Sequence, residues 1–280
     1  MAERPRVAES SAYRRRTALE RVGEIAGRVV PQGAVRGWLR SVYRAAVRLR
    51  TGGSVTATLP GGEAVRLSDE YRFVTWNEAE YQAFRAAVEP GAVALDVGAN
   101  VGAYTLLLGR WVRPGGRVYA FEPAREAFDG LTRHVGLNGL GDDVTCVRAA
   151  AAARTGTALL AVDGLSGANR LADEAGGERV ETVTLDDFCR REGIRPSFIK
   201  IDVEGAELDV LRGARATIAA AGGELALFVE MHPTLWREMG ISAADVQAEI
   251  EAQGLRAEPL RDGVDDLWAL EGECLRLVRR

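Results

Sequence analysis

The sequence predicts an α/β protein of the Rossmann-like type, in which a mostly parallel sheet carries helices on both faces. From residue 93 onward, short apolar runs alternate with segments whose apolar residues recur at three- and four-residue steps. Several of these runs lead into a polar turn directly before a helical segment. The chain has 280 residues, 47% of them hydrophobic, which suffices for one full core. Strand and helix alternation of this kind produces a parallel sheet.

The individual elements follow from the same patterns, taken in chain order. Residues 17–50 predict a helix, and residues 55–59 and 64–67, on either side of the Pro60-Gly61-Gly62 turn, predict a β-hairpin. The strands expected after the hairpin are 93–97, 117–121, 144–149, 158–162, 179–183, 198–202, 225–230, 255–259 and 266–270. The expected helices are 78–88, 101–112, 124–138, one that starts at Thr184, 206–219 and 243–253.

These patterns divide the chain into two parts. Residues 1–70 form a basic helical and hairpin extension, a candidate lid or homo-oligomer contact, and residues 71–280 form the Rossmann-like domain. Residues 1–50 carry twelve arginines against four acidic residues, although the whole chain has a net charge of −4. We interpret this excess as a solvated helical face, because no aromatic residues interleave with the arginines, and we expect no nucleic-acid partner. An anionic membrane surface or acidic partner is the alternative.

The cysteines and the apolar segments indicate the compartment in which the protein is expected. Cys146, Cys189 and Cys274 are far apart and form no CxxC pair, which argues against a structural zinc site or a disulfide framework. No run approaches 18 uninterrupted apolar residues, and residues 1–16 lack the apolar segment of a secretory signal. We therefore expect no transmembrane segment and a cytoplasmic location.

The first motif with chemical content is the segment 95–105, which places an apolar strand directly before a glycine turn and a helix. Ligands of open α/β sheets bind at such carboxyl ends of strands. Gly98 and Gly102 allow the backbone to approach a ligand, and Asn100 tolerates unusual turn geometry. The G-x-x-x-G spacing differs from the G-x-G-x-x-G of dinucleotide sites and disfavours NAD and FAD. Asp96, at the strand end, is expected to orient the turn or to meet the ligand.

A second motif, residues 121–123, places Glu122 at the end of the next strand, 24 residues after Gly98. A carboxylate there can accept hydrogen bonds from both ribose hydroxyls, although Glu122 could also simply begin a helix.

Two further strand ends carry polar residues. Residues 198–207 bring the only lysine of the chain, Lys200, together with Asp202 and Glu204, where cofactor or substrate is expected. Glu207 of the same segment falls in a first helical turn, where it could serve as a cap. His232, after the following strand, can accept a hydroxyl proton near neutral pH, or it could be a surface residue before a proline.

Together these segments resemble the FkbM family of methyltransferases. The resemblance spans roughly residues 75–232 and rests on four segments in order: Asp96–Thr105, Phe121–Pro123, Thr184–Asp187 and Lys200–Glu207. It implies a class I methyltransferase fold with a seven-stranded sheet, and S-adenosylmethionine as the cofactor. By this resemblance the candidate cofactor contacts are Glu78, Asp96, Gly98, Ala99, Asn100, Gly102, Tyr104, Thr105, Glu122, Pro123 and Asp202. Asp96, Gly98, Asn100 and Gly102 are expected along the methionine portion, and Glu122 at the ribose.

The resemblance further implies methyl transfer to a hydroxyl oxygen of a sugar, a polyketide, another natural product or a surface glycan. The candidate catalytic residues are Asp202, Glu204, Glu230 and His232. His232 is the expected base, with Glu204 or Glu230 as alternatives; a divalent metal held by the four residues is a further alternative, which we do not favour.

Two other functions compete with methyl transfer. An NAD(P)-dependent oxidoreductase is disfavoured by the glycine spacing and by the absence of a Tyr-x-x-x-Lys pair. A non-catalytic adaptor that binds anionic polymers through its basic arm would leave the cofactor-like turns unexplained.

Overall fold

The computed structural model describes residues 52–59, 61–162, 169–172, 177–261, 263–264, 266–269 and 271–280. The chain divides into two compact units, Met1–Glu78 and Ala79–Arg280. In the first unit, β1 (Ser54–Thr58) pairs antiparallel with β2 (Ala64–Ser68), which confirms the expected hairpin, and a 3-10 turn (Asp69–Tyr71) follows. The helix expected at residues 17–50 lies outside the described residues.

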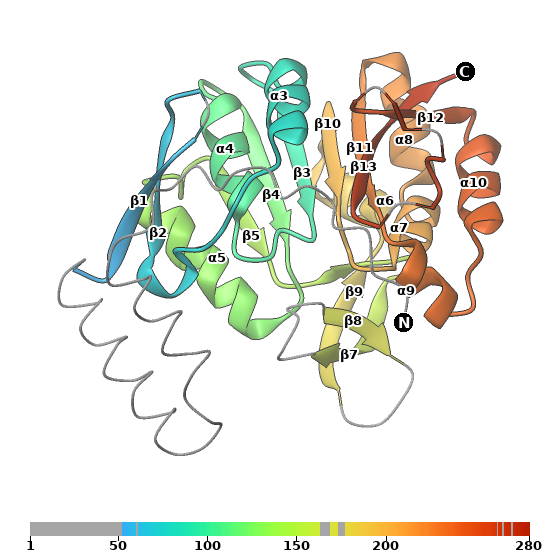
Figure 1. Ribbon diagram of the computed structural model, residues 1–280, viewed down its shortest axis with the longest axis horizontal. Helices are drawn as coiled ribbons and strands as arrows, with labels where there is room; N and C mark the ends of the chain where they lie inside the picture. Colours follow the sequence, from blue (N-terminus) through green and yellow to red (C-terminus); the bar gives the residue numbers. More distant parts are fainter. Residues whose placement is uncertain are drawn as a thin grey trace. The chain divides into compact units, whose positions relative to one another are not determined.

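Seven strands form the main sheet of the second unit (Figure 1). They are β3 (Val93–Val97), β4 (Arg117–Phe121), β5 (Val144–Val147), β10 (Phe198–Ile201), β11 (Ala226–Met231), β12 (Leu255–Pro259) and β13 (Glu273–Arg279). Their order is β12-β13-β11-β10-β3-β4-β5, and only β13 runs antiparallel to its neighbours. This confirms the expected Rossmann-like, mostly parallel sheet of seven strands.

The order of the strands also locates the place where a ligand is expected. From β3 the chain moves outward through β4 to β5, and β10 then returns to the other side of β3. The strand order reverses at this point, and a crevice opens between the carboxyl ends of two neighbouring parallel strands.

Helices cover both faces of the main sheet (Figure 1). They are α3 (Glu78–Ala87), α4 (Ala103–Trp111), α5 (Arg125–Leu137), α6 (Leu185–Glu192), α7 (Glu207–Arg212), α8 (Arg215–Ala221), α9 (Pro233–Glu238) and α10 (Ala243–Ala252). On one face, residues of α6, α7, α8 and α10 share a buried cluster with Leu95 and Ile199. On the other face, Phe84 of α3 packs edge-on against Phe198 and Phe228. None of the helices in the described part is long and apolar enough to cross a bilayer.

A smaller sheet follows the carboxyl end of β5. Its strands are β6 (Ala150–Ala151), β7 (Gly156–Val162), β8 (Asn169–Ala172) and β9 (Glu178–Val183), in the order β6-β9-β7-β8. The strands expected at 158–162 and 179–183 therefore exist but belong to this second sheet. The strand expected at 144–149 ends at Val147, and the chain continues into β6.

The single helix expected at residues 206–219 is wrong, because the chain forms α7 and α8 with a break at Gly213. A Cβ built at Gly213 would lie 2.1 Å from the carbonyl oxygen of Ala152, so the chain passes very close to the second sheet there. The carboxylate of Asp186 then accepts the backbone N–H groups of Ala216 and Thr217, at 3.0 and 2.7 Å, and starts a new helix.

The prediction of a last strand at residues 266–270 is also wrong. Residues 267–269 form a turn in which the Asp266 side chain accepts the backbone N–H of Trp268 at 3.0 Å, a local bond that competes with strand pairing. The final strand is instead β13, seven residues further on, where buried and exposed positions alternate over its second half. Leu267 and Trp268 pack partly buried against the core, and this apolar pair explains the misleading pattern.

Candidate active site

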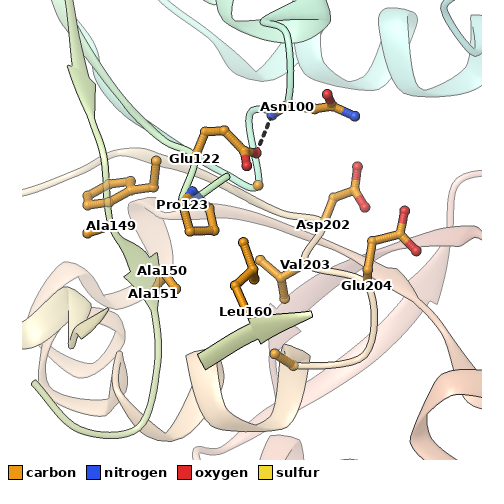
Figure 2. A pocket seen from close by; sticks show the side chains of 13 residues that line it. Asn100, Glu122, Pro123, Ala149, Ala150, Ala151, Leu160, Asp202, Val203 and Glu204 are labelled. Carbon is orange, nitrogen blue, oxygen red and sulfur yellow. Dashed lines mark hydrogen bonds between the residues drawn. The ribbon is translucent and has the colours of Figure 1, made fainter. Parts of the chain in front are cut away.

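A pocket opens at the carboxyl ends of β3, β4 and β10 (Figure 2). Its empty volume is about 640 Å³, part of which is open to solvent. The residues that line it are Gly98, Asn100, Phe121, Glu122, Pro123, Ala149, Ala150, Ala151, Leu160, Asp202, Val203, Glu204 and Ala206. One wall is therefore apolar, and three carboxylates supply the charge.

The turn after β3 is fixed by close contact with the neighbouring strand. Gly98 has a φ of +80°, and a Cβ there would lie 1.6 Å from the carbonyl oxygen of Asp202. The glycine thus lets two strand ends approach each other. Gly98 also lines the pocket, and its expected approach to a ligand stays a prediction. Asn100 has a φ of +49°, as its tolerance of turn geometry predicts, and its backbone N–H points at Glu122.

Glu122 is 95% buried at the end of β4, and its carboxylate is held by backbone groups. Oε2 accepts the N–H of Asn100 at 2.9 Å, and Oε1 accepts the N–H of Ala124 at 2.8 Å. Each oxygen keeps a second acceptor position. Burial raises the pKa of Glu122 to about 7, against the lowering effect of the two N–H groups. The carboxylate is therefore positioned to accept hydrogen bonds from a ligand in the pocket.

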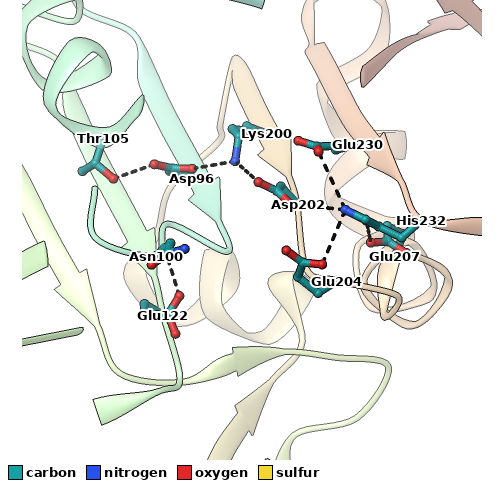
Figure 3. A network of polar contacts seen from close by, with 10 residues as sticks. All are labelled: Asp96, Asn100, Thr105, Glu122, Lys200, Asp202, Glu204, Glu207, Glu230 and His232. Atoms are coloured by element: carbon teal, nitrogen blue, oxygen red, sulfur yellow. Dashed lines mark hydrogen bonds and ion pairs between the residues drawn. The ribbon is translucent and has the colours of Figure 1, made fainter. Parts of the chain in front are cut away.

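A buried ionic network lies behind the pocket, centred on Lys200 (Figure 3). Lys200 and Asp96 are register partners on β10 and β3, and the Nζ atom lies 3.8 Å from Asp96 Oδ1 and 3.0 Å from Asp202 Oδ2. Burial lowers the pKa of Lys200, but Asp202, Asp96 and Glu230 outweigh it and raise the pKa above its usual value. Thr105 Oγ1 donates to the other oxygen of Asp96 at 2.5 Å. The lysine therefore stays charged and ties the ends of β3 and β10 together.

His232 lies at the end of β11 and is held by a second glutamate. Its Nδ1 atom is 2.8 Å from Glu207 Oε1, and Glu207 is fully buried. The same carboxylate accepts the N–H of Gly205 at 2.9 Å and Trp236 Nε1 at 2.5 Å. Glu207 is thus more than a helix cap, because it fixes the orientation of the imidazole. Pro233 at the first position of α9 follows directly, so His232 is the N-cap of that helix rather than a surface residue.

The other imidazole nitrogen faces three carboxylates (Figure 3). His232 Nε2 lies 3.7 Å from Glu204 Oε2, 3.7 Å from Glu230 Oε1 and 3.9 Å from Asp202 Oδ1. Burial alone lowers the pKa of His232, but the hydrogen bond and charge of Glu207, together with Asp202 and Glu230, raise it to about 9. The neutral imidazole that a general base requires is therefore a minority form at pH 7.

The carboxyl groups around His232 also have perturbed pKa values. Burial, with the repulsion of Asp202, raises the pKa of Glu230 to about 9, and burial raises the pKa of Glu204. Glu204 also has a φ of +53°, an uncommon conformation for a residue with a side chain.

Sequence reasoning missed Glu80 on α3. This residue is 95% buried, its pKa is raised by burial, and it interacts with Tyr104 and Lys200. The helical pattern of α3 gave a signal, because Glu80 lies on the same buried side as Tyr81 and Phe84. The proposed contact Glu78, two residues earlier, is exposed and belongs to the N-terminal unit.

The structure divides the other expected cofactor contacts into two groups. Asn100, Gly98, Glu122, Pro123 and Asp202 line the pocket. The rest support the turn behind it: Asp96 and Thr105 through their hydrogen bond, Ala99 through its N–H to Phe121, Gly102 as the N-cap of α4, and Tyr104 beside Phe84 and Lys200. The four expected catalytic residues, Asp202, Glu204, Glu230 and His232, come together in one cluster.

Comparison with models of known protein families assigns the chain to a family. The methyltransferase FkbM domain matches residues 96–256, which is more than half of the chain. The chain therefore belongs to the FkbM methyltransferase family, as the motifs predicted.

The individual relatives share between 15% and 31% sequence identity with this chain. The methyltransferase sdnD of Sordaria araneosa is 31% identical over 153 residues, which are 42% of this chain and 59% of the relative. A methyltransferase FkbM from Methylobacillus flagellatus has a solved structure with 20% identity and a TM-score of 0.45, covering 71% of this chain and 50% of that one. The solved structure of a SAM-dependent O-methyltransferase from Thermotoga maritima has 15% identity and a TM-score of 0.44, and the match covers 80% of this chain and 77% of that one. The chain thus covers only 59% and 50% of the lengths of the first two relatives.

Proposed function

We propose that this protein transfers a methyl group from S-adenosylmethionine to a hydroxyl oxygen of a small-molecule acceptor, such as a sugar, a polyketide or another natural product. The proposal rests on the family, on the place of the pocket at the reversal of strand order, and on the chemistry of its lining. A glycan on a surface offers the same hydroxyl chemistry.

The charge of the pocket is the observation that carries this proposal. Glu122, Asp202 and Glu204 line it, and none of the described lining residues is a lysine or an arginine. A nucleoside with a positively charged sulfonium and an ammonium group suits such a pocket. The pyrophosphate of NAD(P) would instead place two negative charges among carboxylates, without a compensating cation. The lining thus favours S-adenosylmethionine over a dinucleotide.

The residues of the pocket fit the parts of this cofactor. Glu122 keeps one free acceptor position on each oxygen, which matches two neighbouring ribose hydroxyls. Leu160, Val203 and the alanines of residues 149–151 offer an apolar surface for a purine ring. Asp202 lies between this surface and His232, and we assign it to the boundary between cofactor and acceptor.

The reaction requires alignment and the loss of one proton. An oxygen lone pair of the acceptor forms the new C–O bond while the C–S bond breaks and its electron pair returns to sulfur. Nucleophile and methyl carbon must be held about 3 Å apart and in line. The hydroxyl proton leaves to the cluster of His232, Asp202, Glu204 and Glu230, the group of titratable side chains adjacent to the pocket.

Calorimetric titration with S-adenosylhomocysteine tests the cofactor assignment. Wild-type protein is expected to bind it, while Glu122→Ala weakens binding about 100-fold, because the variant loses both ribose hydrogen bonds to a buried carboxylate. Glu126→Ala, an exposed glutamate at the start of α5, is the matched control and should bind like wild type. Binding of NADH in place of S-adenosylhomocysteine would overturn the proposal in favour of an oxidoreductase.

A further inference from the structure

The cluster beside the pocket has the composition of a metal site. One oxygen of Asp202, one oxygen of Glu204 and one ring nitrogen of His232 all lie within 4.8 Å of one another. They follow the ends of two neighbouring parallel strands, β10 and β11, at the same edge of the sheet, and point toward one another (Figure 3).

The distances within the cluster are those of ligands around an ion rather than those of hydrogen bonds. The 3.7 and 3.9 Å separations of His232 Nε2 from Glu204 and Asp202 are too long for hydrogen bonds. With metal–ligand bonds of about 2.1 Å, two ligands of one octahedral ion lie about 3 Å apart when adjacent and about 4.2 Å apart when opposite. The two separations from His232 fall between these values, and all three ligand atoms lie within 4.8 Å of one another, so the side chains are near the positions that one ion would require.

The orientation of His232 is an independent observation. Its side chain is 93% buried, its Nδ1 atom is engaged by Glu207, and the remaining nitrogen points into the carboxylates. A carboxylate on the far nitrogen is the usual support of a metal-binding histidine, because it fixes the ring and its tautomer. The fully buried Glu207 gives His232 this support, with Gly205 and Trp236 holding the carboxylate in turn.

The charge of the region leaves room for a cation. Six carboxyl groups surround the site and the network behind it, namely Glu80, Asp96, Asp202, Glu204, Glu207 and Glu230. Among the described residues that face them, Lys200 and His232 supply the positive charge.

We propose that Asp202, Glu204 and His232 bind one divalent cation of the Mn²⁺ type, which takes both oxygen and nitrogen ligands and which positions the acceptor hydroxyl. The ion lowers the pKa of a hydroxyl that coordinates it. The O–H proton then leaves by way of the cluster to the solvent that reaches the pocket, and the oxygen attacks the methyl carbon while the C–S bond breaks. The catalytic role rests on the proposed function, but the binding of the ion does not.

Direct Mn²⁺ binding tests the site without an acceptor. The full chain is titrated with Mn²⁺ while the electron paramagnetic resonance signal of the free ion is followed, with and without S-adenosylhomocysteine. Glu204→Gln and His232→Ala are expected to weaken Mn²⁺ binding about 10- to 100-fold, because each removes a ligand. Glu204→Gln alters a partly exposed side chain and keeps its size, so it remains informative if His232→Ala fails to fold. Glu238→Gln, an exposed glutamate on α9, should bind Mn²⁺ like wild type.

The outcomes separate this proposal from the proposed function. One ion per chain that both variants lose, with S-adenosylhomocysteine binding retained, supports the site. S-adenosylhomocysteine binding without saturable Mn²⁺ binding below about 1 mM, or with equal Mn²⁺ binding in wild type and variants, overturns the site alone. Mn²⁺ binding without the nucleoside overturns the cofactor assignment and leaves the ion site standing.

Discussion

The two halves of the site use carboxylates in opposite ways. On one side of Asp202, Glu122 is a single buried carboxylate whose oxygens are each held by a backbone N–H. On the other side, Glu204 and Glu230 point at the same imidazole nitrogen at 3.7 Å, without a hydrogen bond to it. The first arrangement is complete before a ligand arrives, whereas the second gathers carboxyl groups whose pKa values are raised by burial.

This difference indicates what each half is expected to bind. A carboxylate fixed by backbone groups offers directed acceptors to neutral hydroxyl donors. Carboxylates that repel one another are stabilised only by a cation or a proton. The nucleoside side should therefore behave as a rigid receptor, and the His232 side should respond to ions and to the acceptor.

The largest expected effect is on methyl transfer, and it comes from a substitution that alters only the His232 side of the site. His232→Ala should lower kcat for methyl transfer about 10²- to 10⁴-fold, since it removes the residue on which proton transfer or ion binding depends. The Kd for S-adenosylhomocysteine, measured calorimetrically on the same preparation, should stay within a factor of about 3. A parallel loss of nucleoside binding would show that the two halves are not separable.

A substitution where the ends of β3 and β10 meet should destabilise the fold on which both sides of the site depend. Gly98→Ala places a methyl group 1.6 Å from the carbonyl oxygen of Asp202 at a φ of +80°, and should destabilise the fold by about 3 kcal/mol or more. Urea unfolding measures the difference. Gly136→Ala on α5, where a Cβ meets nothing within 4 Å, is the control and should be neutral or slightly stabilising. Equal stability of the two variants would contradict the close approach of β3 and β10.

The pH dependence of nucleoside binding sharpens the comparison. The pKa of Glu122 is raised to about 7 in the folded protein, and only its carboxylate form accepts two hydroxyl donors. As the pH falls below 7, the carboxyl group takes up a proton, and the Kd for S-adenosylhomocysteine should rise by about tenfold per pH unit. Titrations between pH 5.5 and 8.5 measure this slope. Glu122→Gln should bind weakly with a flatter profile; an unchanged slope in that variant would assign the proton to another group.

The smallest effect is expected in the scaffold. Ser242 caps α10 through a reciprocal pair with Asp245, and Ser242→Ala should destabilise the protein by about 1 kcal/mol. Thermal unfolding measures this shift, and the Kd values for S-adenosylhomocysteine and Mn²⁺ should not change. A change in either Kd would show that α10 couples to the site.

The sequence was sufficient for the parts of the fold that repeat a local pattern. Arg117–Phe121 and Leu255–Pro259 are strands with the expected bounds, and Asn100 has the expected left-handed turn. The break between α7 and α8 was beyond such reasoning. It depends on Gly213 passing the carbonyl of Ala152 and on capping by Asp186, and both of these are contacts between distant parts of the chain.

The residues of the site could also be predicted from local patterns, but their contacts with one another could not. The motifs identified the residues that end the strands, and these converge as parallel topology requires. What the motifs could not supply was the role of Glu207, which depends on Trp236 and His232 reaching it from the next strand and helix. Glu80 was missed for the same reason, since its interactions with Tyr104 and Lys200 join three separate elements.

The burial of the only lysine has a practical consequence for labelling. Lys200 is 96% buried and held between two aspartates, so an amine-directed reagent cannot reach it while β3 and β10 remain paired. Its modification, followed by mass spectrometry, would therefore report how often the centre of the sheet opens. A chain with 35 arginines and one such lysine carries its own probe of core breathing, without any engineered residue.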